Sequence, residues 1–169
     1  NDLPGFIKVL QQIVWKEFHL PCTISLASNK PVAKIAAQTV KPAGVIYVPH
    51  GTERLFLAPL SIDVIPGVGK KTSEILRKKG FKIVADLQSI SKEKLQRILG
   101  KHGLWIHDVA NGLGPEDLST EHERKSIGCE ETFAHDIADR EGLHKILFSL
   151  AEEVCSSLRY RHLKARTFT

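Results

Sequence analysis

A proline and two glycines near the middle of the chain limit the fold most, because they impose a tight turn between two helical stretches. The segment reads Ile65-Pro66-Gly67-Val68-Gly69-Lys70-Lys71-Thr72. Pro66 disfavours helical geometry at the preceding residue, so a helix through residues 61–64 should end at Ile65. Gly67 and Gly69 allow positive φ and place no side chain between the backbone and a partner. The sequence therefore predicts a bend whose backbone amides are open to a ligand.

A basic amphipathic helix is predicted directly after this bend, over residues 70–79. Ile75 and Leu76 share one of its faces, and Gly80 follows where a glycine cap is typical. The other faces carry Lys70, Lys71, Arg77, Lys78 and Lys79. Amides at a helix N-terminus that is surrounded by lysines favour an anion, and we expect a nucleic-acid phosphate there. The alternative is an ordinary turn that binds nothing. A nucleotide-binding P-loop is disfavoured, because the Gly-x-x-x-x-Gly-Lys-Ser/Thr spacing is missing.

Charge is distributed unevenly along the chain in a way that supports contact with a polyanion. Residues 61–112 hold ten Lys and Arg against five Asp and Glu, whereas residues 113–139 hold two against eight. Residues 1–60 and 140–169 are each basic, with six against three. Basic lobes joined by an acidic connector suit a protein that grips a polyanion with its lobes. Because a basic lobe can also be a solvated surface, the charge supports the bend and does not stand alone.

Other classes of function have little support from the sequence. No apolar run approaches the ~20 residues of a membrane span, so we expect no membrane contact. The three cysteines are widely spaced and odd in number, which favours reduced thiols and a cytoplasmic location. No cysteine and histidine spacing suits zinc, and no pair of carboxylates suggests a catalytic metal site. The sequence therefore predicts neither catalytic nor metal-binding residues.

The first 58 residues are predicted to alternate helix, strand, helix and strand, followed by a short helix. Helices are expected at residues 3–18, 31–40 and 52–58, and strands at residues 22–26 and 45–48. Ser28 or Asn29 can cap the second helix, and Lys41-Pro42-Ala43-Gly44 should end it. Two strands do not form an independent sheet. We therefore expect this layer to be part of a larger domain.

Residues 59–112 are predicted to form a small helical lobe around the bend. Further short helices are expected at residues 83–89, 91–99 and 104–111. Gly100-Lys101-His102-Gly103 is a second basic turn flanked by glycines. It favours either a degenerate second hairpin or a plain turn that packs Trp105 into the core.

Residues 113–123 are predicted to be an acidic linker, and residues 124–169 to be part of a further domain. Residues 124–133 are strand-like, residues 139–160 predict a long amphipathic helix, and residues 163–169 predict a second strand. A β-α-β unit with an unpaired end indicates an incomplete domain. The expected fold class is therefore α+β and predominantly helical.

Three blocks of sequence, in a fixed order, carry a family resemblance. They are residues 25–37 with 41–44, residues 60–72, and residues 125–133 with 165–169. These blocks resemble the end of the palm, the thumb and the little finger of Y-family translesion DNA polymerases, of the DinB (DNA polymerase IV) branch. The resemblance implies that residues 1–58 are the C-terminal part of the palm, residues 59–112 a helix-hairpin-helix thumb, and residues 124–169 the N-terminal part of the little finger.

The resemblance also implies an activity for the parent protein, namely DNA-directed nucleotidyl transfer with two Mg²⁺ ions. The family holds these ions with carboxylates that precede the position matching Asn1, so we expect this chain alone to be inactive. The implied partners are duplex primer-template DNA and an incoming deoxynucleoside triphosphate. A sliding clamp is a further candidate partner of the parent protein.

The match to the family assigns roles to particular residues. Lys41 is the candidate for contact with the triphosphate, and Lys34 could support it. Alternatively, Lys41 is an exposed lysine at a helix C-terminus, where the macrodipole favours it, and Lys34 is simply solvated. The candidates for DNA-backbone contact in the thumb are Gly67, Val68, Gly69, Lys70 and Lys71, and those in the little finger are Lys125, Ser126 and Arg166. Such contacts position DNA and do not read its sequence. A monovalent cation is a further candidate ligand of the thumb hairpin.

One alternative function comes from a different class. A free-standing helix-hairpin-helix module of a repair accessory protein would bind duplex DNA without any catalytic site. A protein-interaction domain for a clamp or a recombinase is a third possibility, which no visible motif supports. Metal-dependent primer extension by the longer protein would separate the polymerase from both.

Overall fold

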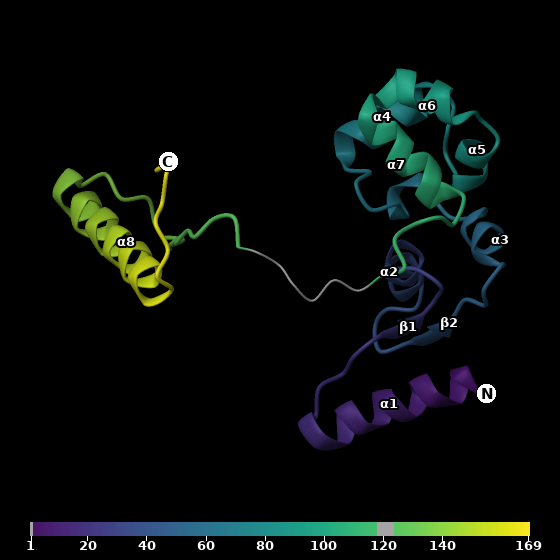
Figure 1. Ribbon diagram of the computed structural model, residues 1–169, viewed down its shortest axis with the longest axis horizontal. Coiled ribbons are helices and arrows are strands. Elements are labelled where there is room, and N and C mark those ends of the chain that lie inside the picture. Colours follow the sequence, from purple (N-terminus) through teal and green to yellow (C-terminus); the bar gives the residue numbers. More distant parts are fainter. Residues whose placement is uncertain (1, 118–123) are drawn as a thin grey trace. The chain divides into compact units, whose positions relative to one another are not determined.

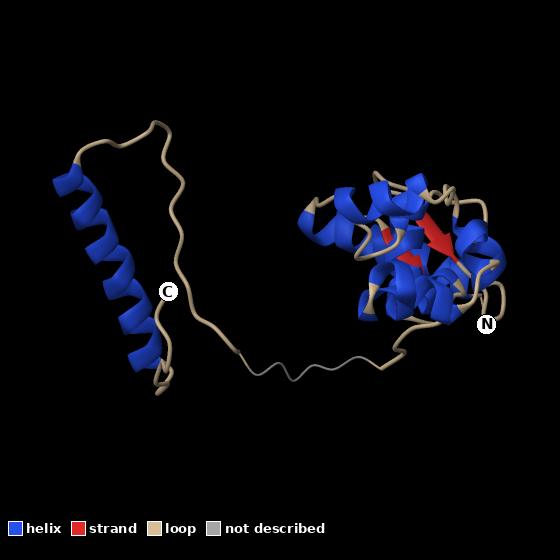
Figure 2. Cartoon of the chain, turned by 90° about the horizontal axis from the view of Figure 1, so that it is seen from above, coloured by secondary structure: helices blue, strands red, loops and turns tan. Residues whose placement is uncertain are grey.

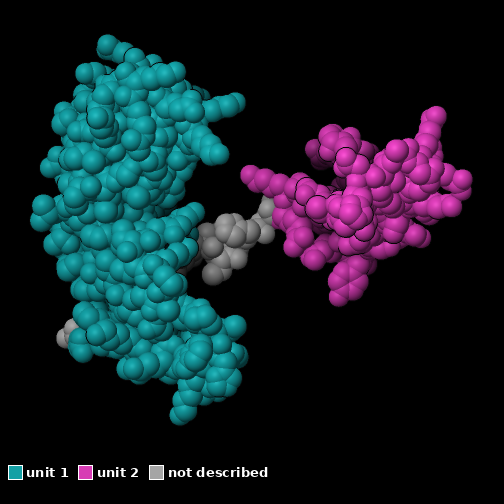
Figure 3. All heavy atoms as spheres, turned by 180° about the vertical axis from the view of Figure 1, so that it is seen from behind, with its two compact units in different colours: residues 1–118 teal, residues 119–169 magenta. Residues whose placement is uncertain are grey.

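The computed structural model describes residues 2–117 and 124–169, which belong to two compact units (Figure 3). Unit 1 comprises residues 1–118 and unit 2 comprises residues 119–169. In the described ranges, no helix is both long and apolar enough to span a membrane.

Unit 1 begins with the predicted alternation of helices and strands (Figures 1 and 2). Its elements are α1 (Leu3–Phe18), β1 (Ile24–Leu26), α2 (Lys30–Thr39), β2 (Val45–Tyr47) and α3 (Glu53–Leu57). The two strands pair in parallel, with Ile24 opposite Val45. Asn29 caps α2 as expected, because its side-chain oxygen accepts a hydrogen bond from the Val32 amide at 3.1 Å.

Gln11 connects α1 to the strand layer. Its side-chain amide donates to the backbone carbonyl of Cys22 at 2.7 Å and to that of Ala43 at 2.9 Å. These carbonyls lie just before the two strands in sequence, so a single side chain on α1 binds both chain segments that lead into the sheet. This contact fixes α1 against the parallel pair.

The helical lobe follows in the same unit. It contains a 3₁₀ turn (Ile62–Val64), α4 (Lys70–Lys78), α5 (Val84–Gln88), α6 (Lys92–Leu99) and α7 (Lys101–Ala110). The short helix expected before the bend is this 3₁₀ turn, and Ile65 is extended as Pro66 requires, with φ −70° and ψ 122°.

The boundary between α6 and α7 differs from the expected one. Gly100 alone separates the two helices with φ 66°, and α7 begins at Lys101 rather than at residue 104. Gly103 therefore lies inside a helix, where an added Cβ would come within 2.3 Å of the Leu95 carbonyl oxygen. Its function is to let α6 and α7 approach closely, and the sequence pattern does not distinguish this use of glycine from a turn.

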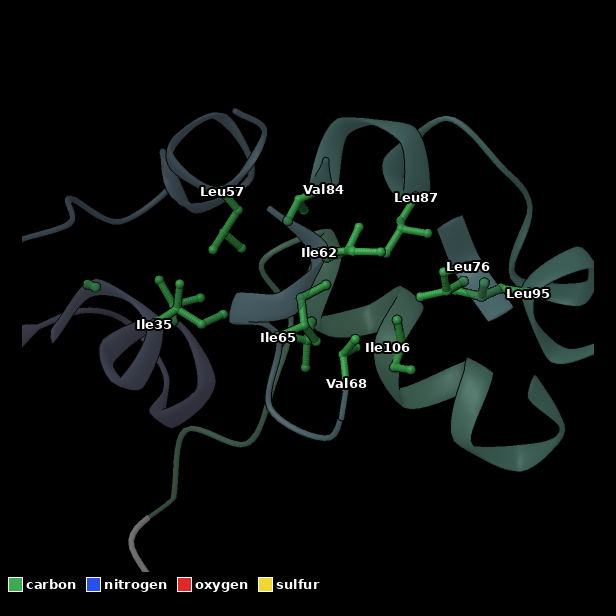
Figure 4. Packing of buried hydrophobic residues seen from close by; sticks show 14 of the residues in the cluster. Ile35, Leu57, Ile62, Ile65, Val68, Leu76, Val84, Leu87, Leu95 and Ile106 are labelled. Carbon is green, nitrogen blue, oxygen red and sulfur yellow. The ribbon is translucent and has the colours of Figure 1, made fainter. Parts of the chain in front are cut away.

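A single hydrophobic core runs through unit 1 from α2 to α7. Ile35 of α2, Leu57 of α3 and Ile106 of α7 are all at most 1% exposed and belong to one buried cluster (Figure 4). The side chains of Ile65 and Val68, on either side of the bend, belong to the same cluster. The palm and thumb assignments of residues 1–58 and 59–112 stay predictions, and the core continues across the boundary between them.

Unit 2 contains the predicted long helix, α8 (Arg140–Tyr160). Asp139 caps it, because its carboxylate accepts hydrogen bonds from the amides of Glu141 and Gly142. The flanking segments 124–133 and 163–169 differ from the β-α-β expectation, since neither forms a strand. A strand exists through its hydrogen bonds to a neighbour, and within the described residues no strand lies beside these segments. The predicted linker, residues 113–123, is irregular over 113–117, and its remainder lies outside the described residues.

Candidate nucleic-acid interface

The bend at the start of α4 is a four-residue turn with Pro66 and Gly67 at its centre. The Val68 amide donates to the Ile65 carbonyl oxygen at 2.9 Å and so closes the turn. Gly67 has φ 99°, the left-handed conformation that glycine adopts without strain. Proline followed by a residue of positive φ is the arrangement of a type II turn. The expected conformation of Gly67 is therefore confirmed.

The N-terminus of α4 is open to solvent. Gly69 is its N-cap residue, and within the described chain no side chain caps the first amides of this helix. Gly67, Gly69, Lys70 and Lys71 are all exposed, whereas Val68 packs into the core. An uncapped helix N-terminus carries unsatisfied donors and a partial positive charge, and two lysines begin the helix here. This arrangement suits a phosphate oxygen.

The structure corrects two details of the predicted site. The Val68 amide is not available to a phosphate, because the Ile65 carbonyl accepts its hydrogen bond inside the turn. Gly69 has φ −85° and ψ −179°, an extended conformation that any residue can adopt, so it does not use the positive φ open to glycine. No heavy atom lies within 4 Å of the position that a Cβ would take, so the protein itself leaves open space beside Gly69.

A polar brace ties the 3₁₀ turn before the bend to α4 after it. The Asp63 carboxylate accepts a hydrogen bond from the Ser73 hydroxyl at 2.5 Å, a second from the Ser61 hydroxyl at 2.7 Å, and pairs with the Arg77 guanidinium. The Arg77 Nε also donates to the Ser73 hydroxyl at 3.1 Å. Hydrogen bonds from Ser73, Ser61 and Arg77 lower the pKa of Asp63 to about 2. Arg77 thus has an internal partner, which the sequence pattern did not indicate.

Two side chains of α7 contact the bend from the other side. The Trp105 indole Nε1 donates to the Pro66 carbonyl oxygen at 3.0 Å. The His102 Nε2 lies 3.0 Å from the Gly67 carbonyl oxygen, and because a carbonyl only accepts, this nitrogen carries the proton. The expectation that Trp105 would pack into the core holds in part: its ring contacts the core cluster, while its N–H reaches the bend.

The remaining candidate residues lie on exposed surface. Lys34 is an exposed residue of α2, and Lys41 is exposed in the loop that follows this helix. In unit 2, Lys125, Ser126 and Arg166 are exposed on irregular segments rather than on strands. The candidates at residues 67–71 thus lie together in the bend and the first residues of α4. The roles of the other five candidates stay predictions. Among the described residues, no group of three or more His, Cys, Asp and Glu could hold a metal ion.

Comparison with known proteins identifies relatives for both units. Residues 63–113 match the family model described as "DNA polymerase-iota, thumb domain", and residues 124–169 match the "impB/mucB/samB family C-terminal domain". The chain is 36% identical to a DNA polymerase IV of Opitutus terrae over 162 residues, which cover 95% of this chain and 41% of that protein. It is 37% identical to a DNA polymerase IV of Methanoculleus marisnigri over 160 residues, or 95% of this chain and 44% of that protein.

The fold gives a concordant result. A solved Y-family DNA polymerase chimera of Dbh and Dpo4 has a TM-score of 0.74 and 26% identity, over 90% of this chain and 44% of that one. This chain therefore spans less than half of the length of these relatives.

Alanine should lower the stability of the fold at one glycine of the bend and leave it nearly unchanged at the other. We expect Gly67→Ala to lower the free energy of unfolding by about 1 kcal/mol or more, because it strains a positive φ. The new Cβ would also lie 2.6 Å from the His102 ring. Gly69→Ala should leave the unfolding free energy within about 0.5 kcal/mol of the wild type, as at most surface sites. Urea denaturation measures both, and equal costs at the two positions would contradict the turn geometry.

The Asp63 brace should make stability depend on pH in acid. The pKa of Asp63 is lowered from 3.8 to about 2 in the folded chain, so its contribution is present above pH 3.8 and is lost as the pH falls to about 2. Solvent screens this half-exposed carboxylate, so we expect a contribution of only about 1 kcal/mol. The difference in unfolding free energy between wild type and Asp63→Asn should be constant above about pH 5 and vanish near pH 2. A difference independent of pH would show that the carboxylate charge does not hold the brace.

Proposed function

This chain is a segment of a Y-family, DinB-like DNA polymerase, and on that premise we propose that it holds the backbone of duplex DNA for translesion synthesis. The observation that carries the proposal is the exposed bend at residues 67–69, which opens into the uncapped N-terminus of α4. Backbone amides and lysine side chains recognise phosphate and not bases, so binding should not depend on DNA sequence. This property suits an enzyme that must copy past damaged bases.

The parent protein would add the chemistry. We propose that it is a DNA-directed DNA polymerase that uses divalent ions, Mg²⁺ in particular, held by residues outside this chain. Lys41, with Lys34 in support, would contact the triphosphate of the incoming deoxynucleotide. Lys125, Ser126 and Arg166 of unit 2 would contact the DNA backbone in the little finger. A cytoplasmic location and a sliding clamp as a partner remain part of the proposal, with no residue of this chain assigned to the clamp.

The thumb hairpin is also a candidate site for a monovalent cation, which would bridge backbone carbonyls and a phosphate. The two central carbonyls of the bend, those of Pro66 and Gly67, already accept hydrogen bonds from α7. Because a carbonyl oxygen has two lone pairs, each of these two oxygens has one left for a cation.

Salt dependence tests the role of the bend. We expect residues 1–169 to bind duplex DNA with an affinity that falls as salt rises, and Lys70→Ala to reduce the slope of log K against log salt by about one. Lys8→Ala is the matched control. Lys8 is an exposed lysine of α1 with no assigned contact to DNA, so its replacement should leave the slope unchanged. Fluorescence anisotropy on two unrelated duplex sequences measures the slopes. A slope change that appears with only one sequence would contradict contact with the backbone alone.

Primer extension tests the activity of the parent protein. The complete protein should extend a primer on a template only when a divalent ion is present, and residues 1–169 should not. The free-standing DNA-binding module is the second candidate function, and it predicts binding by both proteins and extension by neither. Failure of the complete protein to incorporate nucleotides would therefore favour the module.

A further inference from the structure

We propose that Trp105 and His102 are positioning residues that aim the amide of Gly67 at the DNA phosphate. This inference rests on the proposed function of the bend and adds two residues that lie outside the hairpin. Both belong to α7, more than 30 residues after the bend. They are three residues apart, so they project from neighbouring positions on the same face of that helix.

These two side chains bind both central carbonyls of the turn. The Pro66 carbonyl oxygen accepts the indole N–H of Trp105 at 3.0 Å. The Gly67 carbonyl oxygen lies 3.0 Å from Nε2 of His102. The remaining hydrogen bond of the turn, from the Val68 amide to the Ile65 carbonyl, closes it without constraining the central peptide unit.

The planarity of the peptide bond fixes the direction of the Gly67 amide. In a trans peptide the C=O and the following N–H point in opposite directions. Because Trp105 holds the Pro66 carbonyl toward α7, the Gly67 amide must point away from α7 and into solvent. Type I and type II turns differ mainly by a flip of this one peptide unit, and glycine at the third position permits both. The indole hydrogen bond therefore selects the orientation in which the amide is presented.

The His102 ring fills the space beside Gly67. A Cβ built on Gly67 would lie 2.6 Å from Cε1 and 2.9 Å from Nε2 of the His102 ring, so the imidazole occupies the place of the missing side chain. His102 itself is exposed, and its ring adds little to the core. Its contact is thus with the backbone of the bend, which it covers from the side of α7.

The test separates the N–H group of Trp105 from its apolar ring, which packs against the core. Trp105→Phe retains an aromatic ring and removes the donor. We expect it to weaken binding of duplex DNA about 2- to 12-fold at fixed salt, the equivalent of one net hydrogen bond. The slope of log K against log salt should not change, because no cation is lost. Trp15→Phe, at an exposed tryptophan of α1, is the matched control and should bind as the wild type does.

His102 gives a second and independent measurement. His102→Leu should weaken DNA binding in the same way, whereas His102→Gln retains an N–H donor and should recover most of the affinity. Thermal unfolding of each variant shows whether the fold is intact. Weaker binding with an unchanged slope, at a temperature where each variant is fully folded, supports the positioning role.

Three outcomes would overturn the inference. If Trp105→Phe and His102→Leu bind DNA as the wild type does while Lys70→Ala still lowers the salt slope, the inference fails and the proposed function stands. If binding falls only in proportion to a loss of folded protein, the two residues are structural and the inference fails. If the wild-type chain shows no salt-dependent binding of DNA, the proposed function fails and this inference fails with it.

Discussion

The first amides of an α-helix have no carbonyl partner within the helix, and at α4 this general deficit becomes the basis of the site. In the part of the chain that the structure describes, no side chain satisfies these groups, and a glycine occupies the cap position where serine, aspartate or asparagine is common. By contrast, Asn29 caps α2 and Asp139 caps α8 with their side chains. The N-terminus of α4 therefore differs from those of α2 and α8, although α7 also begins after a glycine, Gly100, without a side-chain cap.

An open helix end is useful only if the backbone before it is held still, and the structure does this from two directions. On one side the Asp63 carboxylate joins the 3₁₀ turn to Ser73 and Arg77 of α4. On the other side two donors from α7 bind the carbonyls of the bend. Because Ile65 and Val68 are also buried in the core, the exposed glycines lie on a rigid support. Preorganised amides bind an anion without the entropic cost of ordering a loop.

Much of this site could be predicted from the sequence, because its local parts depend on neighbouring residues. The position of the bend, the extended Ile65, the helix after it and the cap at Asn29 all follow from residues within a few positions of each other. The bonds from Trp105 to Pro66 and from Ser73 and Arg77 to Asp63 join residues 10 to 39 positions apart, and no local pattern marks them. The prediction of strands at residues 124–133 and 163–169 was wrong for a related reason. A strand depends on a hydrogen-bonded neighbour that composition does not reveal.

The continuous core of unit 1 has a mechanical consequence. Ile35 on α2 and Ile106 on α7 belong to one packed cluster, and the side-chain amide of Asn29 donates to the Gly112 carbonyl at 2.8 Å, just beyond α7. Close-packed interiors have low compressibility and transmit strain rather than absorb it. A displacement of the exposed bend would therefore be transmitted through the core to α2, which carries Lys34 on its surface. The distance between the bend and that lysine should therefore stay nearly constant.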